Sequence, residues 1–195
     1  MDLVEAHGDA MDRFDGLVRR IGDDQWDAPT PCTEWSVRDL LNHLVSEQLW
    51  APWLLDGATM DEVGDRFDGN VLGPDPVTAW ADSSAAARTA FRKPGALDGD
   101  VHVSVGMIDA VEYGWQMTTD LAVHGWDLAK AIGAPQPITD ELAHELTSRI
   151  EPQLDAMQGF GIFDPPVSVG DDATAADRLV AMLGRDPAWC ARVKR

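Results

Sequence analysis

Apolar residues recur along the chain at the spacing of one helical face, and this recurrence indicates where helices lie. In the first such stretch, Leu3, Ala10 and Phe14 share one stripe, and His7 lies near the middle of it. The same pattern predicts helices over residues 3–21, 37–55, 76–93, 109–132, 140–160 and 175–184. Because four of these are long and strand patterns are scarce, we predict an all-α fold, a four-helix bundle with extra short helices at the C-terminal end.

Polar residues and glycines between the stripes indicate how the helices begin and end. Ser36 can cap the second helix together with Asp39 three residues later. Thr139 can cap the helix that starts at residue 140, and Gly133 is a typical C-terminal stop for the helix before it.

Two segments between the helices have other patterns. Residues 56–76 are rich in Gly and Asp, which predicts a loop with one helical turn. The segment VHVSVG, residues 101–106, alternates briefly, so an extended segment or hairpin arm is an open interpretation in which His102 faces solvent.

Composition bounds the class of protein. A chain of 195 residues, 45% of them hydrophobic, can bury one sizeable core, so we expect residues 1–195 to form a single domain. Its 15 Lys and Arg against 34 Asp and Glu give a net charge of −19, which disfavours binding to nucleic acid and to anionic membranes. There is no signal-peptide pattern and no apolar run of membrane-spanning length. The two cysteines, Cys32 and Cys190, are interpreted as reduced thiols, and together these features predict a cytoplasmic protein.

Two ionisable residues share an apolar helix face. Asp120 and His124 are four residues apart, so both point the same way as Leu121 and Leu128, toward the core. A buried carboxylate is costly unless it is paired, and either a hydrogen-bonded Asp–His pair or a shared metal ion would satisfy it. His43, in the second helix, is the best candidate for a third ligand from a facing helix. Both interpretations stay open on the residues alone.

Other reactive residues have simpler interpretations. His7 fits a buried core histidine and His144 an exposed one. Cys32 fits an inert structural thiol, although its position before a helix could instead lower the pKa of the thiol. Glu47 is interpreted as a solvated or partnered side chain rather than a ligand. Asp127 is either an acceptor that orients a ligand imidazole or a carboxylate on the helix surface.

Three segments resemble those of a known protein family. TPCTEWSVRDLLNHLV, TDLAVHGWDLAKAIG and AADRLVAMLGRDPAW together resemble the DinB-like and mycothiol-dependent maleylpyruvate isomerase-like metal-binding proteins, and most closely an uncharacterised actinobacterial branch. The resemblance implies a DinB-type four-helix bundle holding one divalent metal ion, with zinc expected and nickel as the alternative. The ligands of the isomerase relatives, a histidine of the second helix and a Glu-x-x-x-His pair, fall here on His43, Asp120 and His124. Asp120 is one methylene shorter than the glutamate of that pattern.

The resemblance also implies a class of function. Related bundle proteins use mycothiol, bacillithiol or glutathione, so we expect a metal-dependent transferase or isomerase in which such a thiol reacts with a small electrophilic substrate. Trp35 and Trp126 are candidates for the walls of a substrate cleft. The isomerase relatives carry a further C-terminal α+β domain, whereas the residues after Gly133 predict helices and connectors. Relatives often form homodimers, so a homodimer is an open expectation.

Two other uses of the same residues stay open. A metal ion with a free position could activate water for hydrolysis. A catalytically silent or metal-free bundle could act as a binding or sensor module. An open cleft that reaches His43 and His124 would favour a catalyst, whereas a sealed core around a dry Asp120–His124 pair would favour the silent module.

Overall fold

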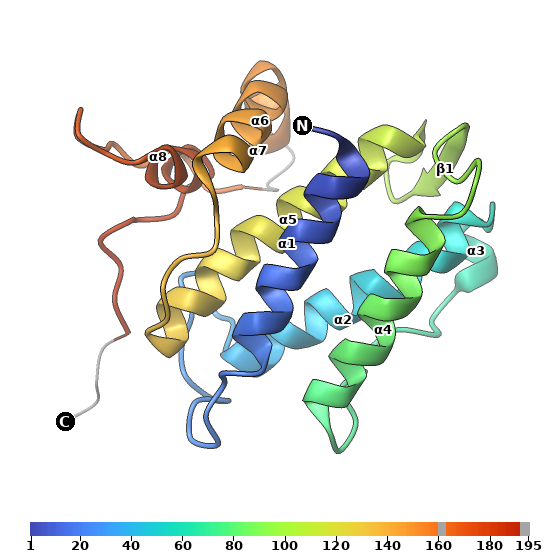
Figure 1. The fold of residues 1–195 in the computed structure, drawn as a ribbon, viewed down its shortest axis with the longest axis horizontal. Helices are drawn as coiled ribbons and strands as arrows, with labels where there is room; N and C mark the ends of the chain where they lie inside the picture. Colours follow the sequence, from blue (N-terminus) through green and yellow to red (C-terminus); the bar gives the residue numbers. More distant parts are fainter. Residues whose placement is uncertain (160–162, 192–195) are drawn as a thin grey trace.

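The computed structural model describes residues 1–159 and 163–191, and most of this part of the chain is helical. The four longest helices (Figure 1) are α1 (Leu3–Val18), α2 (Val37–Leu55), α4 (Pro76–Phe91) and α5 (Ala110–Ile132). α2 packs against α4 and α5, and α1 packs against the same two helices. The helical periodicity thus located all four, although the first ends three residues earlier than predicted.

Side chains that were predicted to cap helices do so. Ser36 accepts a hydrogen bond from the backbone N–H of Asp39, whose carboxylate accepts one from the backbone N–H of Ser36. Thr139 accepts a backbone hydrogen bond from the first turn of α6 (Asp140–Ile150). Gly133 ends α5 at a φ of 70°, in the left-handed region that favours glycine. Local sequence therefore sets these helix ends.

The described chain is not entirely helical, which corrects the predicted all-α fold. Strands β1 (Asp100–Val103) and β2 (Gly106–Asp109) form an antiparallel hairpin in which Val101 pairs with Ile108. Gly106, directly after the two-residue loop, has a φ of 110°, a conformation that other residues rarely adopt. The alternation of valines is too short to identify a strand by itself. Whether this segment forms a strand depends on hydrogen-bond pairing with β2 across the turn. The fold is therefore mostly helical with one small two-stranded sheet.

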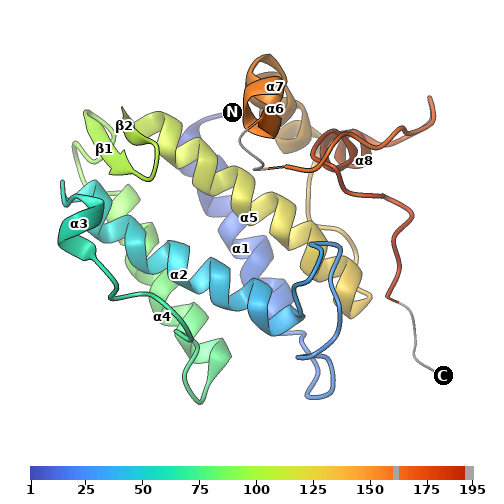
Figure 2. The same ribbon diagram turned by 180° about the vertical axis from the view of Figure 1, so that it is seen from behind.

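The loop after α2 contains the helical turn that its composition predicted. This turn is α3 (Met60–Val63), and it lies beside the hairpin (Figure 2). His102 of β1 accepts a hydrogen bond at Nδ1 from the backbone N–H of Met60, at 3.1 Å. His102 is consequently half-buried, which corrects the expectation that it faces solvent.

The helix predicted over residues 140–160 is interrupted. α6 ends at Ile150, and α7 (Leu154–Gly159) follows after a 3₁₀ turn that contains Pro152. Proline has no backbone N–H to continue the helical hydrogen bonds, which explains the interruption. The predicted end at residue 160 lies outside the described residues.

The last helix, α8 (Ala175–Met182), packs against α6. In both views the C-terminal helices lie on the far side of α5 from α4 (Figures 1 and 2). The segment after α8 then returns toward α5, where Arg185 meets a residue of that helix. The C-terminal part of the chain is thereby brought next to the middle of α5.

The main core lies between the four long helices. Phe14 of α1 and Trp80 of α4 are fully buried, with ring centroids 4.6 Å apart. α1 approaches α5 closely at Gly114, where an added Cβ would lie 2.7 Å from a methyl carbon of Leu3. Although these helices bury apolar faces, no helix in the described ranges combines the length and apolar character needed to cross a membrane.

His7 lies in this core, as its position in the first stripe predicted. Its ring centroid is 4.3 Å from that of Phe91, and its Nε2 has no hydrogen-bond partner among the described residues. Burial, followed by the positive charges of Arg88 and Arg92, lowers the pKa of His7 from 6.5 to about 4. The folded protein therefore keeps this ring neutral at a pH where the unfolded chain would protonate it.

We expect this histidine to make the protein less stable in mild acid. Above about pH 6.5 the ring is neutral in both states, so it adds no pH dependence. As the pH falls from about 6.5 to about 4, only the unfolded chain gains the proton, and the free energy of unfolding decreases by up to about 3 kcal/mol. Urea denaturation at pH 7.5 and pH 5.0 should show about 2 kcal/mol more loss in the wild type than in His7→Leu. The control His144→Leu, at an exposed position, should behave as the wild type, and equal losses in wild type and His7→Leu would contradict this prediction.

Candidate metal centre

Asp120 and His124 project from adjacent turns of α5, and His43 reaches them from α2. Nε2 of His43 lies 3.0 Å from Oδ2 of Asp120, and Nε2 of His124 lies 3.4 Å from Oδ1 of the same carboxylate. The three potential ligand atoms all lie within 4.8 Å of one another. The structure therefore brings together the three residues that the sequence singled out, and metal binding by them stays a prediction.

The carboxylate of Asp120 lies between two imidazole rings, which decides its charge. Burial alone would raise the pKa of Asp120, but His124 and His43 outweigh burial and hold the pKa well below its usual range. Burial would likewise lower the pKa of His124, but Asp120, and after it Asp127, raise it to about 9. The cluster thus attracts positive charge, which either a proton on His124 or a metal ion can supply.

The donor atoms of this cluster fit a divalent metal ion. Two imidazole nitrogens and one carboxylate oxygen are a common ligand set of catalytic zinc, which takes three protein ligands and leaves a position open. The same donors suit nickel. The three atoms are already neighbours, as the ligands of one ion with bonds of about 2 Å must be.

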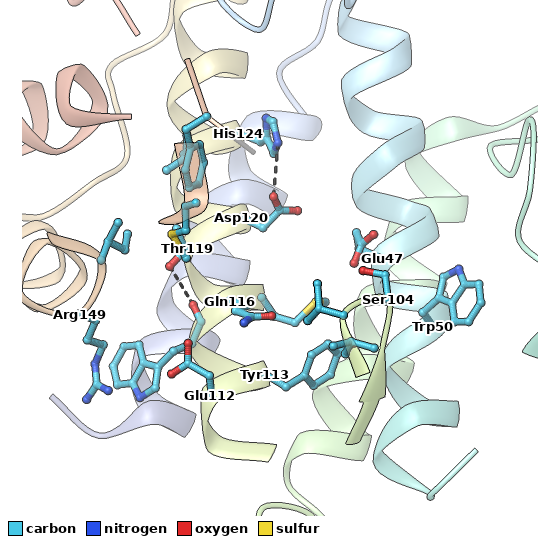
Figure 3. A pocket seen from close by; sticks show the side chains of 18 of the residues that line it. Glu47, Trp50, Ser104, Glu112, Tyr113, Gln116, Thr119, Asp120, His124 and Arg149 are labelled. Carbon is cyan, nitrogen blue, oxygen red and sulfur yellow. Dashed lines mark hydrogen bonds and ion pairs between the residues drawn. The ribbon is translucent and has the colours of Figure 1, made fainter. Parts of the chain in front are cut away.

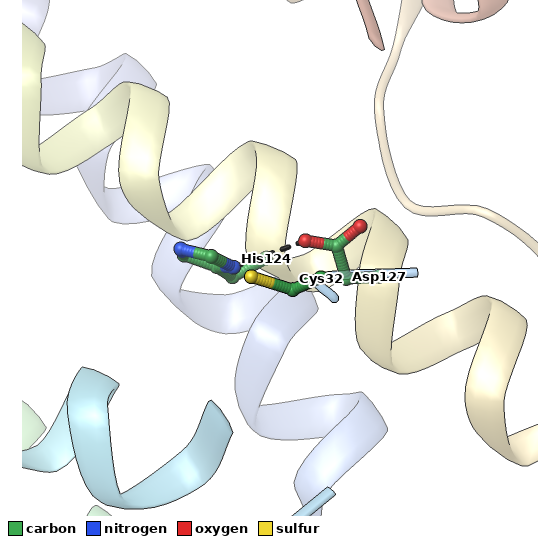
Figure 4. Close-up of side chains that lie close together, drawn as sticks. All are labelled: Cys32, His124 and Asp127. Atoms are coloured by element: carbon green, nitrogen blue, oxygen red, sulfur yellow. Dashed lines mark hydrogen bonds and ion pairs between the residues drawn. The ribbon is translucent and has the colours of Figure 1, made fainter. Parts of the chain in front are cut away.

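A buried carboxylate orients His124 from the other side of the ring (Figure 4). Oδ2 of Asp127 lies 3.0 Å from Nδ1 of His124, and the Asp127 side chain is fully buried. A neutral His124 that donates its Nδ1–H to Asp127 keeps the lone pair of Nε2 directed toward Asp120 and His43, as a metal ligand requires. Of the two interpretations of Asp127, the structure supports the orienting acceptor, since a surface carboxylate would be exposed.

Arg185, after α8, completes this buried arrangement. Its Nη2 donates to the same oxygen of Asp127 at 3.2 Å, and its side chain is 11% exposed. The second oxygen of Asp127 and Nε of Arg185 have no partner among the described residues. This residue was missed in the sequence, because only the tertiary fold brings it to Asp127, 58 positions earlier. Its one signal was its place in the segment AADRLVAMLGRDPAW.

Cys32 lies on the same side of His124 as Asp127 (Figure 4). Its Sγ and one ligand atom from each of these two residues lie within 4.8 Å of one another, which forms a second candidate group. Burial, followed by the negative charge of Asp127, raises the pKa of the Cys32 thiol to about 11. The thiol is therefore protonated near neutral pH, as expected for an inert cysteine and opposite to the alternative of a lowered pKa. Both Cys32 and Cys190 are free thiols.

The two tryptophans proposed as cleft walls lie in different surroundings. The ring of Trp35 lies 4.9 Å from His43 and 5.5 Å from His124, measured between centroids, so it covers both imidazoles. Trp126 is fully buried in the core, and neither Trp126 nor Trp35 lines the cavity at the site, which corrects the expectation for both. Trp35 contacts the two imidazoles because it lies directly before α2, the helix that carries His43.

A cavity of about 500 Å³ opens next to the three candidate ligands (Figure 3). Asp120 and His124 lie at one end of it, and Glu47, a residue of α2, lies across the cavity from them. His43 also lines the cavity and lies beside Asp120. Burial, and then the charge of Asp120, raises the pKa of Glu47. The cluster is therefore accessible from a cavity, which favours a catalytic or ligand-binding site over a dry pair in a sealed core.

The chain shares most of its length with one protein family and with two curated proteins. Residues 7–129 match the family described as mycothiol maleylpyruvate isomerase N-terminal domain, a span that holds His43, Asp120, His124 and Asp127. Two Mycobacterium tuberculosis proteins are each 32% identical to the chain, Uncharacterized protein MT0763 of strain CDC 1551 / Oshkosh and Uncharacterized protein Rv0738 of strain H37Rv. Each match covers 95% of this chain and 98% of the relative. No solved structure matches the chain significantly.

Proposed function

Because the chain belongs to the mycothiol maleylpyruvate isomerase N-terminal domain family, we propose that it is a metal-dependent enzyme of low-molecular-weight thiol chemistry. In this proposal a thiol such as mycothiol reacts with a small electrophilic substrate, in a transfer or an isomerisation. One divalent ion, zinc or nickel, is assigned to His43, Asp120 and His124. The four long helices are assigned to the DinB-type bundle that the resemblance implies.

One observation carries this proposal. Three donor atoms from two helices lie within 4.8 Å of one another at the wall of an open cavity. The buried carboxylate of Asp127 lies 3.0 Å from Nδ1 of His124, a position that favours the tautomer with a free Nε2 in the neutral ring. A pair that only satisfied itself in the core would need neither the cavity nor the third residue.

Each residue of the site has a role in the proposed enzyme. His43 and His124 hold the ion as neutral imidazoles, and Asp120 contributes a negative charge. Trp35 covers the two imidazole rings and keeps water from that side of them. Glu47 faces the cavity, where its carboxylate can accept a proton from a bound thiol or substrate. A bound zinc ion would supply a positive charge that favours the thiolate, the nucleophilic form of a thiol.

A thiol-dependent conversion assay tests the proposed activity. Protein loaded with zinc or with nickel is incubated with mycothiol, bacillithiol or glutathione and a panel of electrophiles. Free thiol and remaining electrophile are both measured over time, because a transfer consumes the thiol whereas an isomerisation releases it again. We expect one thiol to support faster conversion of an electrophile with the loaded protein than with chelated protein, and the gain to be absent in His124→Ala. Equal rates for loaded and chelated protein across the panel would contradict the proposal.

The orienting role of Asp127 predicts a defined loss of metal affinity. In Asp127→Asn the buried negative charge beside His124 is lost, so the imidazole becomes a poorer ligand and Arg185 loses its partner. Loss of such an outer partner typically lowers metal affinity about 10–100-fold, and we expect a loss in this range. Competition with a chromophoric zinc chelator measures it. Asp82→Asn, at an exposed position of α4, is the matched control, and equal affinities of the two variants would contradict the role.

A further inference from the structure

The cavity at the candidate metal centre has one polar end and one apolar end. On α5, positions 124, 120, 116 and 112 follow one another at four-residue spacing along the cavity, with His124 and Asp120 at the polar end. On α2, His43 and Glu47 are followed by Trp50 and Leu54. A ligand that reaches the candidate ligands therefore extends along both helices into apolar surroundings.

The apolar end is built from four different elements. Beside α5, the elements α2, α3, the hairpin and α6 contribute apolar residues to it, namely Trp50, Leu54, Met60, Val103, Val105 and Ile150. A volume of about 500 Å³ lies within the range of pockets that enclose drug-sized molecules. Both tryptophan and aliphatic side chains are present, as in sites that bind flat aromatic molecules.

The two arginines that line the cavity each have a carboxylate partner. The Arg185 guanidinium donates to Asp127, and the Arg149 guanidinium donates to Glu145 at 2.7 Å while lying 3.9 Å from the ring centroid of Trp115. Neither partner carboxylate lines the cavity, and each has a second partner, His124 for Asp127 and the N-terminal ammonium for Glu145. Both arginines are thus already engaged in ion pairs.

Two glutamates that line the cavity have no cationic partner among the described residues. Glu47 and Glu112 both line it, and neither forms an ion pair with another described residue. An anionic ligand would bring a further negative charge beside them, and a buried unpaired charge is costly. The net charge of −19 adds a repulsion of the same sign.

We propose that this cavity binds an uncharged aromatic molecule, with its rings against Trp50 and the hairpin and its reacting carbon toward Asp120. Its role as a substrate rests on the proposed function, whereas its binding does not.

Two fluorescent probes with the same ring system test the proposal. N-phenyl-1-naphthylamine is uncharged, and 8-anilino-1-naphthalenesulfonate adds one sulfonate to the same frame. We expect saturable binding of the amine and at least about tenfold weaker binding of the sulfonate, because the sulfonate meets unpaired carboxylates. Equal or tighter binding of the sulfonate, or no saturable binding of the amine, would overturn the proposal.

Matched variants locate the bound probe. Trp50→Ala removes an aromatic wall and should weaken the amine about fivefold or more, whereas Trp53→Ala, on the same helix but outside the cavity, should not. Val105→Asp, at the exposed tip of the hairpin, should also weaken the amine and keeps the test decisive if Trp50→Ala does not fold. Glu112→Gln should tighten the sulfonate and leave the amine unchanged. Equal effects of the two tryptophan variants, together with no effect of Val105→Asp, would overturn the assigned location.

Zinc affinity is measured on the same samples, so that the two proposals fail separately. Binding of the amine by protein that binds no zinc would contradict the proposed function alone. Zinc binding without saturable binding of the amine would contradict the substrate class alone.

Discussion

Replacing His124 with alanine is expected to abolish stoichiometric metal binding. His124 is the ligand with the most support, because Asp120 faces its Nε2 and the buried Asp127 faces its Nδ1. Loss of an outer partner alone costs about 10–100-fold in affinity, so loss of the ligand itself should exceed about 100-fold. Metal analysis of protein purified without a chelator should then fall from about one ion per chain to near zero.

His144→Ala is the matched control for this variant. His144 is exposed on α6 and does not line the cavity, so its removal should leave the metal content unchanged. His43→Ala should behave as His124→Ala, because each histidine supplies one of the three donor atoms. Full metal occupancy in both His43→Ala and His124→Ala would show that the ion lies elsewhere.

The largest effect on stability is expected from Phe14→Ala. Phe14 is fully buried against Trp80, with ring centroids 4.6 Å apart. Its ring also packs closely on α5, since a Cβ added to Gly125 would lie 3.6 Å from it. Truncating a fully buried phenylalanine typically costs about 3–5 kcal/mol, since the cavity that remains cannot fully collapse. For a protein of this size the melting temperature should fall by roughly 10 °C.

A thermal melt followed by circular dichroism measures this loss. Phe67→Ala is the matched control, because Phe67 is only half-buried and its ring centroid lies 6.0 Å from that of Trp50. Its melting temperature should fall by less than half as much. Equal decreases in the two variants would mean that Phe14 does not lie at the centre of the core.

Helices were predictable in this chain because their signals are local. Apolar periodicity placed the four long helices, and Ser36, Asp39 and Gly133 marked ends that the structure confirms. The hairpin was less predictable, since its stability depends on pairing between β1 and β2 and on the backbone of Gly106. The helix predicted over residues 140–160 did not take Pro152 into account, and this proline lies in the 3₁₀ turn that breaks the helix.

The candidate site, like the fold, was predictable where its signals are local in sequence. Asp120 and His124 could be paired from their spacing on one helix, and His43 was a candidate from a facing helix that the family resemblance supported. Two things could not be derived from spacing. Asp127 is buried because Arg185 pairs with it, and Arg185 arrives from a segment that approaches α5 only in the folded protein. The cavity likewise depends on the hairpin and α6, which lie on either side of α5 in sequence and far from His43.

The site claim is tested most directly by locating the ion. Crystals grown with one equivalent of zinc are measured on both sides of the zinc absorption edge, so that anomalous scattering identifies the metal. We expect one peak about 2.0–2.2 Å from Nε2 of His43, Nε2 of His124 and a carboxylate oxygen of Asp120. Zinc found instead between Cys32 and Asp127, or no peak at either place, would contradict that expectation.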